Sequence, residues 1–513
     1  MGPHFKAFIA VFIVSTVALF FLRQGFAPLI GQKRATHWSA TWLIMTSLAF
    51  LLTNYWMFII VAGIAAFGLS RAEPVRPAIY ILLLSFVPTL GEAIPGFAGI
   101  NKFIEVNPQL AILFVVLLPL MFSGAAMKKL NKVGVKADLF FLLFLILQII
   151  LSVRAPSFTH MLRTALHEFL LIAPIYYVMS RYPKSFSDMR ILSAALVFPA
   201  IVLSAVSIPE FLRNWHFYNS VSTNWFGAMP FGYTMREGYL RASTSVFNPI
   251  VWGYIAMCGL GIGIAVLNDK ISNFYKYAGI ALLGVGLIVS LSRGPWIGAV
   301  VVLGVYVLLS PNVVTRSMQA AVGGVAALAI SLMTPFGKDI ISLIPFVGGE
   351  RDATVTYRQK LLENAWQVIL EHPFIGSADF MAHSALQSLR QGQGIIDIVN
   401  TYLQIGLKSG LTGLILFLGF FLCVLSSLLK VHKRAKKADP VMANYCRAYI
   451  ATICGVLLTI FTTSSVGQIP YLYWSLGGLG IALARVVHQQ LDSGVTQTTV
   501  PAASSAAEEF AWK

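Results

Sequence analysis

Long apolar runs recur along this chain, and they constrain its fold more than any other feature of the sequence. Each run holds about 15–20 residues, the length that a helix needs to cross the hydrocarbon core of a bilayer. An open strand cannot cross that core because its backbone groups would lack hydrogen-bond partners. We therefore expect an all-α polytopic membrane protein with roughly 12–15 transmembrane helices. The runs lie near residues 7–22, 39–53, 56–70, 78–93, 109–124, 139–153, 163–180, 191–209, 249–267, 278–292, 296–310, 320–336, 400–429, 446–464 and 471–487.

Two regions leave the number of spans open. Residues 39–70 read as a tight hairpin broken at Asn54, and the run 78–93 contains Pro88 and Glu92. We expect the first run to be a retained span, since no small-residue cleavage site of a signal peptide follows it.

The charge of the chain follows the same pattern. Of its 513 residues 57% are hydrophobic and 11% are charged, whereas about a quarter of a soluble domain is charged. The net charge of +17 resides mainly in short loops between apolar runs, where basic residues set membrane topology. This distribution argues against nucleic-acid binding, which uses basic patches on a soluble module.

Basic loops also orient the chain. Placing the basic loops in the cytoplasm is consistent with the spans between them. The longer loops 210–248 and 337–398 then lie on the opposite, outer face, together with the junction at Arg293. The basic loops are 127–136, 181–190, 268–276 and 430–437.

This pattern divides the chain into five expected parts. They are N-terminal transmembrane helices (1–209), a transmembrane core with an outer loop (210–336), a large helical outer loop (337–398), C-terminal transmembrane helices (399–488) and a disordered cytoplasmic tail (489–513).

The outer loop contains an amphipathic segment at 357–372, which Pro373 ends. Helical spacing predicts one apolar face. That face either lies on the bilayer surface, roofs a cavity or caps the bundle. Its residues are Tyr357, Leu361, Leu362, Ala365, Val368 and Ile369.

The junction Ser292-Arg293-Gly294-Pro295-Trp296 separates two spans. An arginine at the centre of a span costs about 2.5–3.5 kcal/mol on insertion, and less at a junction. We expect Gly294 and Pro295 to break the helix, with the next helix beginning at Pro295. A snorkelling arginine is the alternative, but the outer face is the wrong side for a charge that sets topology.

Three further polar residues lie on this face. Arg241 precedes Asn248-Pro249, a helix-start pair that is fully explained as structure. Arg241 itself either is solvated or faces an anion. Arg358 lies in the large outer loop, and Asp397 precedes a span, where a helix dipole alone also favours an acid.

Together these residues fit a transfer reaction from a diphosphate carrier. Arginines neutralise a leaving diphosphate through paired donors, and a carboxylate accepts the proton of an attacking hydroxyl. Because no nucleotide sugar is available outside the membrane, the donor must arrive activated on a lipid.

Other polar residues carry weaker signals. We expect Arg163, His167 and Glu168 to form a structural cluster, with a place in the acceptor path as the alternative. His383 is a candidate second acid or base. The sequence contains no Walker A, HExxH, GxSxG or CxxC motif and no DxD metal motif.

Four segments, in order, resemble the O-antigen ligase/polymerase superfamily. "RASTSVFNPIVWGY" is similar to its R-x-x-G-x-F-x-N-P segment, and "SLSRGPWIGAVVV" to its S-R-G segment. "YRQKLLENAWQVILEHPFIGSADF" resembles its large periplasmic loop, and "VNTYLQIGLKSGLTGLILF" the helix that follows. The resemblance covers residues from about 241 to 420.

The resemblance implies a GT-C-like membrane glycosyltransferase that inverts configuration and uses neither metal nor cofactor. It would act at the periplasmic face of a bacterial inner membrane on glycans linked to undecaprenyl diphosphate. By resemblance Arg241 and Arg293 contact the diphosphate and Arg358 supports the site, while Asp397 as the base is our inference. Further expected substrate contacts are Tyr357, Asn400, Trp296 and His383.

One position departs from the family. Ligases have a histidine directly before the asparagine of H-N-x-Y-L, and here that residue is Val399. We therefore favour a polymerase of exopolysaccharide or O-antigen repeats over a ligase that acts on lipid A or protein. A lipid-diphosphate-sugar transporter is the third alternative. The expected partners are the lipid-linked donor, a glycan acceptor, the bilayer and other polysaccharide assembly proteins.

Overall fold

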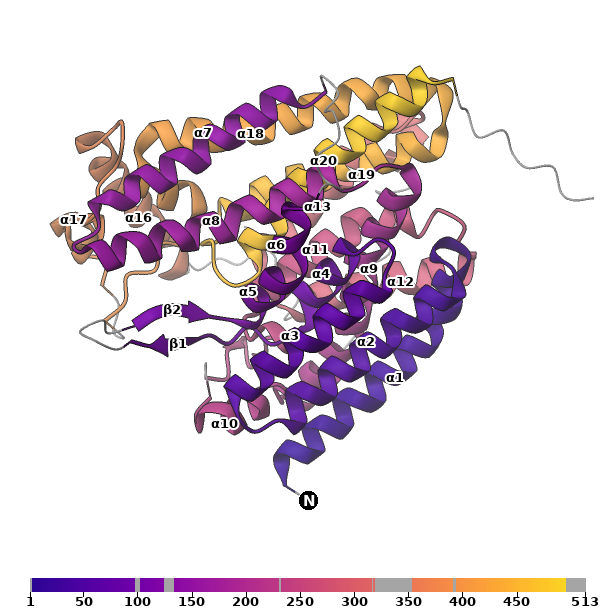
Figure 1. The fold of residues 1–513 in the computed structure, drawn as a ribbon, viewed down its shortest axis with the longest axis horizontal. Coiled ribbons are helices and arrows are strands. Elements are labelled where there is room, and N and C mark those ends of the chain that lie inside the picture. The colour runs from indigo at the N-terminus through magenta and orange to yellow at the C-terminus, as the bar shows by residue number, and fades with distance from the viewer. Residues whose placement is uncertain are drawn as a thin grey trace, which may run out of the picture.

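A computed structural model describes residues 2–96, 102–123, 133–229, 232–315, 317–318, 353–390 and 394–494 of the chain. The described parts form a helical bundle with two short hairpins (Figure 1). Seven described helices are long and apolar enough to cross a membrane by length and composition. The predicted all-α polytopic membrane fold is confirmed. The predicted span 320–336 and the tail beyond residue 494 lie outside the described residues.

The N-terminal third follows the apolar runs closely, with one correction. Asn54 caps α3 by accepting a hydrogen bond from the Met57 amide, as expected for a hairpin broken there. The predicted span 78–93 is wrong, because its helix ends at Phe86 and Glu92 begins a strand. The elements are α1 (Pro3–Ile30), α2 (Gln32–Leu51), α3 (Tyr55–Ala72), α4 (Pro77–Phe86) and the antiparallel strands β1 (Glu92–Pro95) and β2 (Lys102–Val106).

The next stretch contains an interrupted helix and three long ones. The interrupted helix is α5 (Pro108–Ile112), a π-helical turn (Leu113–Leu117) and α6 (Leu118–Met121). It is followed by α7 (Val135–Leu151), a 3₁₀ turn (Ser152–Arg154), α8 (Phe158–Arg181) and α9 (Phe186–Arg213).

The second half contains the central helices and the outer segments. The elements that lie in the two segments predicted as outer loops are α10 (Asn219–Phe226), β3 (Met235–Arg236), β4 (Tyr239–Leu240), 3₁₀ turns at Thr244–Val246 and Phe380–Ala382, α16 (Ala353–Glu371) and α17 (Ser384–Gln387). The remaining helices are α11 (Pro249–Val266), α12 (Asn273–Val289), α13 (Arg293–Leu308), α18 (Thr401–Ala438), α19 (Pro440–Ile460) and α20 (Ile469–Asp492).

Burial separates central helices from those at the rim. In α9 and α11, 89% of the residues in the most apolar window are buried, against 28% in α1. A helix that is apolar on all sides and buried belongs to the interior, whereas the exposed apolar face of α1 suits lipid.

Ion pairs join the basic loops at one end of the bundle. Asp138 pairs with Arg181 and Arg485, and Asp269 pairs with Arg190. Since α9 runs from this end to Glu210, the loops around residues 210–248 lie at the other end. The basic loops and the loops around residues 210–248 therefore lie at opposite ends of the bundle, and the assignment of those ends to the cytoplasm and the outer face stays a prediction.

The outer helix α16 buries its apolar face within the protein. Leu361, Ala365, Val368 and Ile369 pack in a small core with the first turns of α18. Leu362 is an exception, since it is 45% exposed on the other face. The buried face of α16 thus contains the predicted apolar residues except Leu362, and it packs against the bundle.

The turn that follows α16 packs against a break in the helical backbone of α18. Gly410 has φ 67°, and the Leu411 amide donates to the Pro373 carbonyl at 2.7 Å. The backbone of Phe374 lies so close that a side chain at Gly410 would collide with it. Arg154 adds hydrogen bonds to the carbonyls of Ile375, Gly376 and Lys408.

Candidate functional site

The junction between α12 and α13 is the centre of the site. α12 ends at Val289, Leu291 has a left-handed φ of 45°, and α13 begins at Arg293. The expected helix start at Pro295 is therefore wrong by two residues. Pro295 lies in the first turn, where its missing N–H leaves no hydrogen bond unmade. The left-handed φ of Leu291 is strained for a non-glycine residue, and strain of this kind clusters at functional sites.

Gly294 has a different role from the one expected. It is helical, so it does not break the chain. Instead, a Cβ atom there would overlap the hydroxyl of Thr462, which lies in the loop between α19 and α20. Gly294 therefore permits α13 to approach that loop closely.

Arg241 lies over the same junction. The Ala242 amide donates to the Val289 carbonyl at 3.0 Å, and Nη2 of Arg241 donates to Oγ of Ser292 at 3.0 Å. Burial, with a contribution from the charge of Arg236, lowers the pKa of Arg241 to about 10. Within the described residues, its Nε is buried without a hydrogen-bond partner. A buried cation with an unused donor suits a bound anion.

A buried acid that the sequence reasoning missed holds the Arg241 loop. Glu210 is fully buried at the outer end of α9. Its carboxylate accepts hydrogen bonds from the amides of Phe217, Ser243 and Thr244 at 2.9–3.2 Å. Two of these charge-assisted bonds fix the backbone two and three residues beyond Arg241, and the third ties Phe217 to the same carboxylate. The only local signal was an acid beside Pro209 near the end of a span.

Arg358 and Asp397 lie near the loop between α19 and α20, within electrostatic range of each other. Nη2 of Arg358 donates to the Thr462 carbonyl at 3.2 Å. The Tyr357 hydroxyl donates to the Asp397 carbonyl at 2.9 Å and accepts from the Asp397 amide at 3.1 Å. Desolvation raises the pKa of the Asp397 carboxyl, and the charge of Arg358 opposes that shift. The Asp397 side chain keeps contact with solvent.

The loop between α19 and α20 connects these groups. The Thr463 carbonyl accepts from both the amide and the hydroxyl of Thr401. Asn400 caps α18 by accepting from the amides of Tyr402 and Leu403, so its side-chain oxygen is used in structure. The role of Thr462 and Thr463 was missed, although the polar run "TTSS" between two apolar helices was a usable signal.

Four of the predicted residues thus gather around the start of α13. Arg241 bonds Ser292, which directly precedes Arg293, and Gly294 abuts Thr462, whose carbonyl binds Arg358. Asp397 lies within electrostatic range of Arg358. Loops far apart in sequence therefore place three guanidinium groups and one carboxylate at one end of the bundle.

Other predicted residues have contacts elsewhere. Trp296 donates from Nε1 to the Leu287 carbonyl at 2.8 Å and packs against the main core. His383 contacts Glu371 at 2.9 Å and caps α17. Arg163 binds the carbonyls of β2, and Glu168 pairs with Lys408, which fits the structural role expected for that cluster.

The chemistry open to this site follows from its groups. Guanidinium groups bind phosphates through paired donors, and a carboxylate with a raised pKa accepts protons. Across the described ranges, no three His, Cys, Asp or Glu side chains are grouped so that they could hold a metal ion. The positive charge available for an anion there comes from arginine.

Part of the chain matches a known protein family. No curated protein matches the chain. A family model described as O-Antigen ligase matches residues 278–418, a segment that includes Arg293, Arg358 and Asp397 but not Arg241. This match confirms the resemblance seen in the motifs over residues 278–418.

Proposed function

We propose that this protein joins oligosaccharide repeat units carried on undecaprenyl diphosphate, at the periplasmic face of a bacterial inner membrane. The product would be an exopolysaccharide or O-antigen chain. The superfamily supports a ligase or polymerase activity in general. The finer assignment rests on the gathering of Arg241, Arg293, Arg358 and Asp397 around the start of α13.

The arginines suit the leaving group of such a reaction. When the bond between the anomeric carbon and the diphosphate oxygen breaks, the electron pair stays on the diphosphate. Arg241, which bonds Ser292, and Arg293, which follows Ser292, would stabilise that added charge. This contribution would replace a metal ion, which is why we assign a metal-independent reaction.

Asp397 suits the acceptor side. Its carboxylate would take the proton of the acceptor hydroxyl as the hydroxyl oxygen attacks the anomeric carbon. Tyr357 holds the Asp397 backbone, which limits the region that the carboxylate can reach. A single displacement of this kind inverts the configuration at that carbon.

The choice of polymerase over ligase rests on Val399. Its side chain packs beside the small outer core, so an apolar residue fills the position where ligases have histidine. The family model, described as O-Antigen ligase, favours transfer to lipid A or protein as the second candidate. A transporter fits less well, because the charged residues of the site lie at one end of the bundle and not at its middle.

Purified protein and undecaprenyl-diphosphate-linked repeats test the proposal. Chain growth is expected with the natural protein and with the control variant Arg213→Ala. Arg213 is an exposed arginine at the end of α9 that carries Glu210. Growth should be lost in Arg293→Ala and Asp397→Asn. Transfer to lipid A without chain growth would establish the ligase instead, and binding without any product would establish the transporter.

A further inference from the structure

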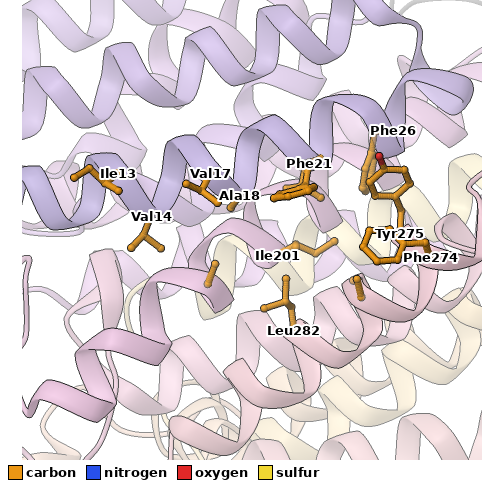
Figure 2. A pocket seen from close by; sticks show the side chains of 14 residues that line it. Ile13, Val14, Val17, Ala18, Phe21, Phe26, Ile201, Phe274, Tyr275 and Leu282 are labelled. Atoms are coloured by element: carbon orange, nitrogen blue, oxygen red, sulfur yellow. The ribbon is translucent and has the colours of Figure 1, made fainter.

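An apolar groove opens on the side of the bundle, away from the charged site. It has a volume of about 410 Å³ and lies between α1, α9 and α12 (Figure 2). That volume is within the range of small-molecule sites, roughly 300–1,000 Å³. Among the side chains that line it are Ile13, Val17, Phe21, Ile201, Ala278 and Leu282.

The groove exists because α1 and α12 meet at one end and diverge above it. Tyr275 of α12 donates from its hydroxyl to Oε1 of Gln24 at 2.9 Å. Its ring packs on Gly25, where a Cβ atom would be 2.8 Å from the ring. Beyond this bridge the facing side chains include Ala18 and Ala278, which are too small to fill the gap.

The groove and the charged site share α12. Phe274 and Tyr275 lie at the inner end of the groove in Figure 2, and Leu282 lies farther along the same helix. From Leu282 to the outer end of α12 is about 10 Å, and from Phe274 about 22 Å, at 1.5 Å per residue. The Val289 carbonyl at that outer end binds the Ala242 amide, directly after Arg241.

These dimensions discriminate between possible occupants. The apolar wall accepts hydrocarbon and excludes a polar headgroup. One leaflet is about 15 Å deep, half of the hydrocarbon core, so the chain of an outer-leaflet phospholipid would end before Phe274. Toward the cytoplasmic side, the bridge between Tyr275 and Gln24 joins α12 to α1 and narrows the gap between them. A longer chain that descends from the outer face reaches all of it.

We propose that this groove holds the prenyl chain of the lipid-linked donor while its diphosphate lies at Arg241 and Arg293. This inference rests on the proposed function. The groove would make the enzyme selective for long prenyl chains, and it would orient the diphosphate along α12. Because lipid tails are as apolar as the groove, the benefit comes from packing and orientation.

Filling the groove tests this assignment. Ala278→Trp places an indole in the groove, and Ala281→Trp places the same side chain on the exposed face of α12. With an undecaprenyl-linked donor, we expect Ala278→Trp to raise KM about fivefold, and Ala281→Trp to leave it unchanged. With a geranyl-linked donor, which is too short to reach the groove, the variants should equal the natural protein. Ala18→Trp fills the groove from the opposite wall and should repeat the result.

A second measurement does not depend on activity. Undecaprenyl diphosphate with a photoreactive group at its far end should label peptides of α1, α9 or α12, and Ala278→Trp should abolish that labelling. Labelling that persists in Ala278→Trp, or labelling that excess phospholipid prevents, would overturn the assignment. Failure of the proposed function has a different signature, namely no glycan transfer from either donor by any variant.

Discussion

Gly253 of α11 controls how closely the central helix approaches the charged junction. A Cβ atom at this position would be 2.7 Å from Oγ of Ser290 and 3.1 Å from two carbons of the Pro295 ring. Ordinary contacts begin near 3.4 Å, so Gly253→Ala would displace Oγ of Ser290 by about 0.7 Å and the Pro295 ring by about 0.3 Å. The rigid proline ring cannot rotate aside as a flexible side chain would.

The size of the effect follows from that displacement. Overpacking a well-packed site costs about 1–3 kcal/mol of stability, and the gain in helix propensity from glycine to alanine returns about 1 kcal/mol. Misplacement by about 1 Å can reduce a rate roughly 10²-fold. Since Pro295 is two residues from Arg293, we expect the rate of glycan transfer to fall by about one to two orders of magnitude, with a small loss of Tm.

A double-mutant cycle makes the cause identifiable. Ser290→Ala removes the closest clash and leaves an overlap of about 0.3 Å with Pro295, so Gly253→Ala/Ser290→Ala should recover most of the rate. Gly304→Ala is the matched control, because nothing lies within 4 Å of a Cβ atom at that position of α13. Full activity in Gly253→Ala would refute the reasoning. So would an equal loss of rate in Gly253→Ala and in Gly253→Ala/Ser290→Ala.

Four further outcomes are expected. Asp397→Asn should abolish transfer while Tm stays equal or rises slightly, because desolvation of the ionised carboxylate opposes folding at neutral pH; a clear drop in Tm would indicate a structural role. Tyr357→Phe should lower kcat by roughly tenfold with KM unchanged, as two hydrogen bonds to the Asp397 backbone are lost. The rate of glycan transfer should fall as pH drops through the raised pKa of Asp397. Donor KM should rise as pH exceeds about 10, where Arg241 loses its charge.

Features with local causes were predictable from sequence. Apolar length located the helices, and Asn54 and Asn248 occupy the caps that their chemistry favours. Loop charge and motif order brought Arg241, Arg293, Arg358 and Asp397 to one end without any knowledge of their contacts. For these residues, position along the chain and alternation of the spans were sufficient.

Features that depend on distant contacts were not predictable in this way. Glu210 binds amides seven or more residues away, and Thr462 meets residues more than a hundred positions earlier in the sequence. The start of α13 was misplaced because Gly294-Pro295 suggests a break, whereas the turn occurs at Leu291 in an unfavourable conformation. No pattern of apolar residues contains that information.

The break at Gly410 has a consequence for the membrane that surrounds this protein. Long helices adjust to bilayers of different thickness by tilting. The short part of α18 before Gly410 is held by the Pro373 turn and by Thr463. The long part after Gly410 exposes apolar side chains on one side, which suits lipid. We expect a thicker or thinner bilayer to tilt only the part of α18 after Gly410, so that hydrophobic mismatch does not change the position of Asp397.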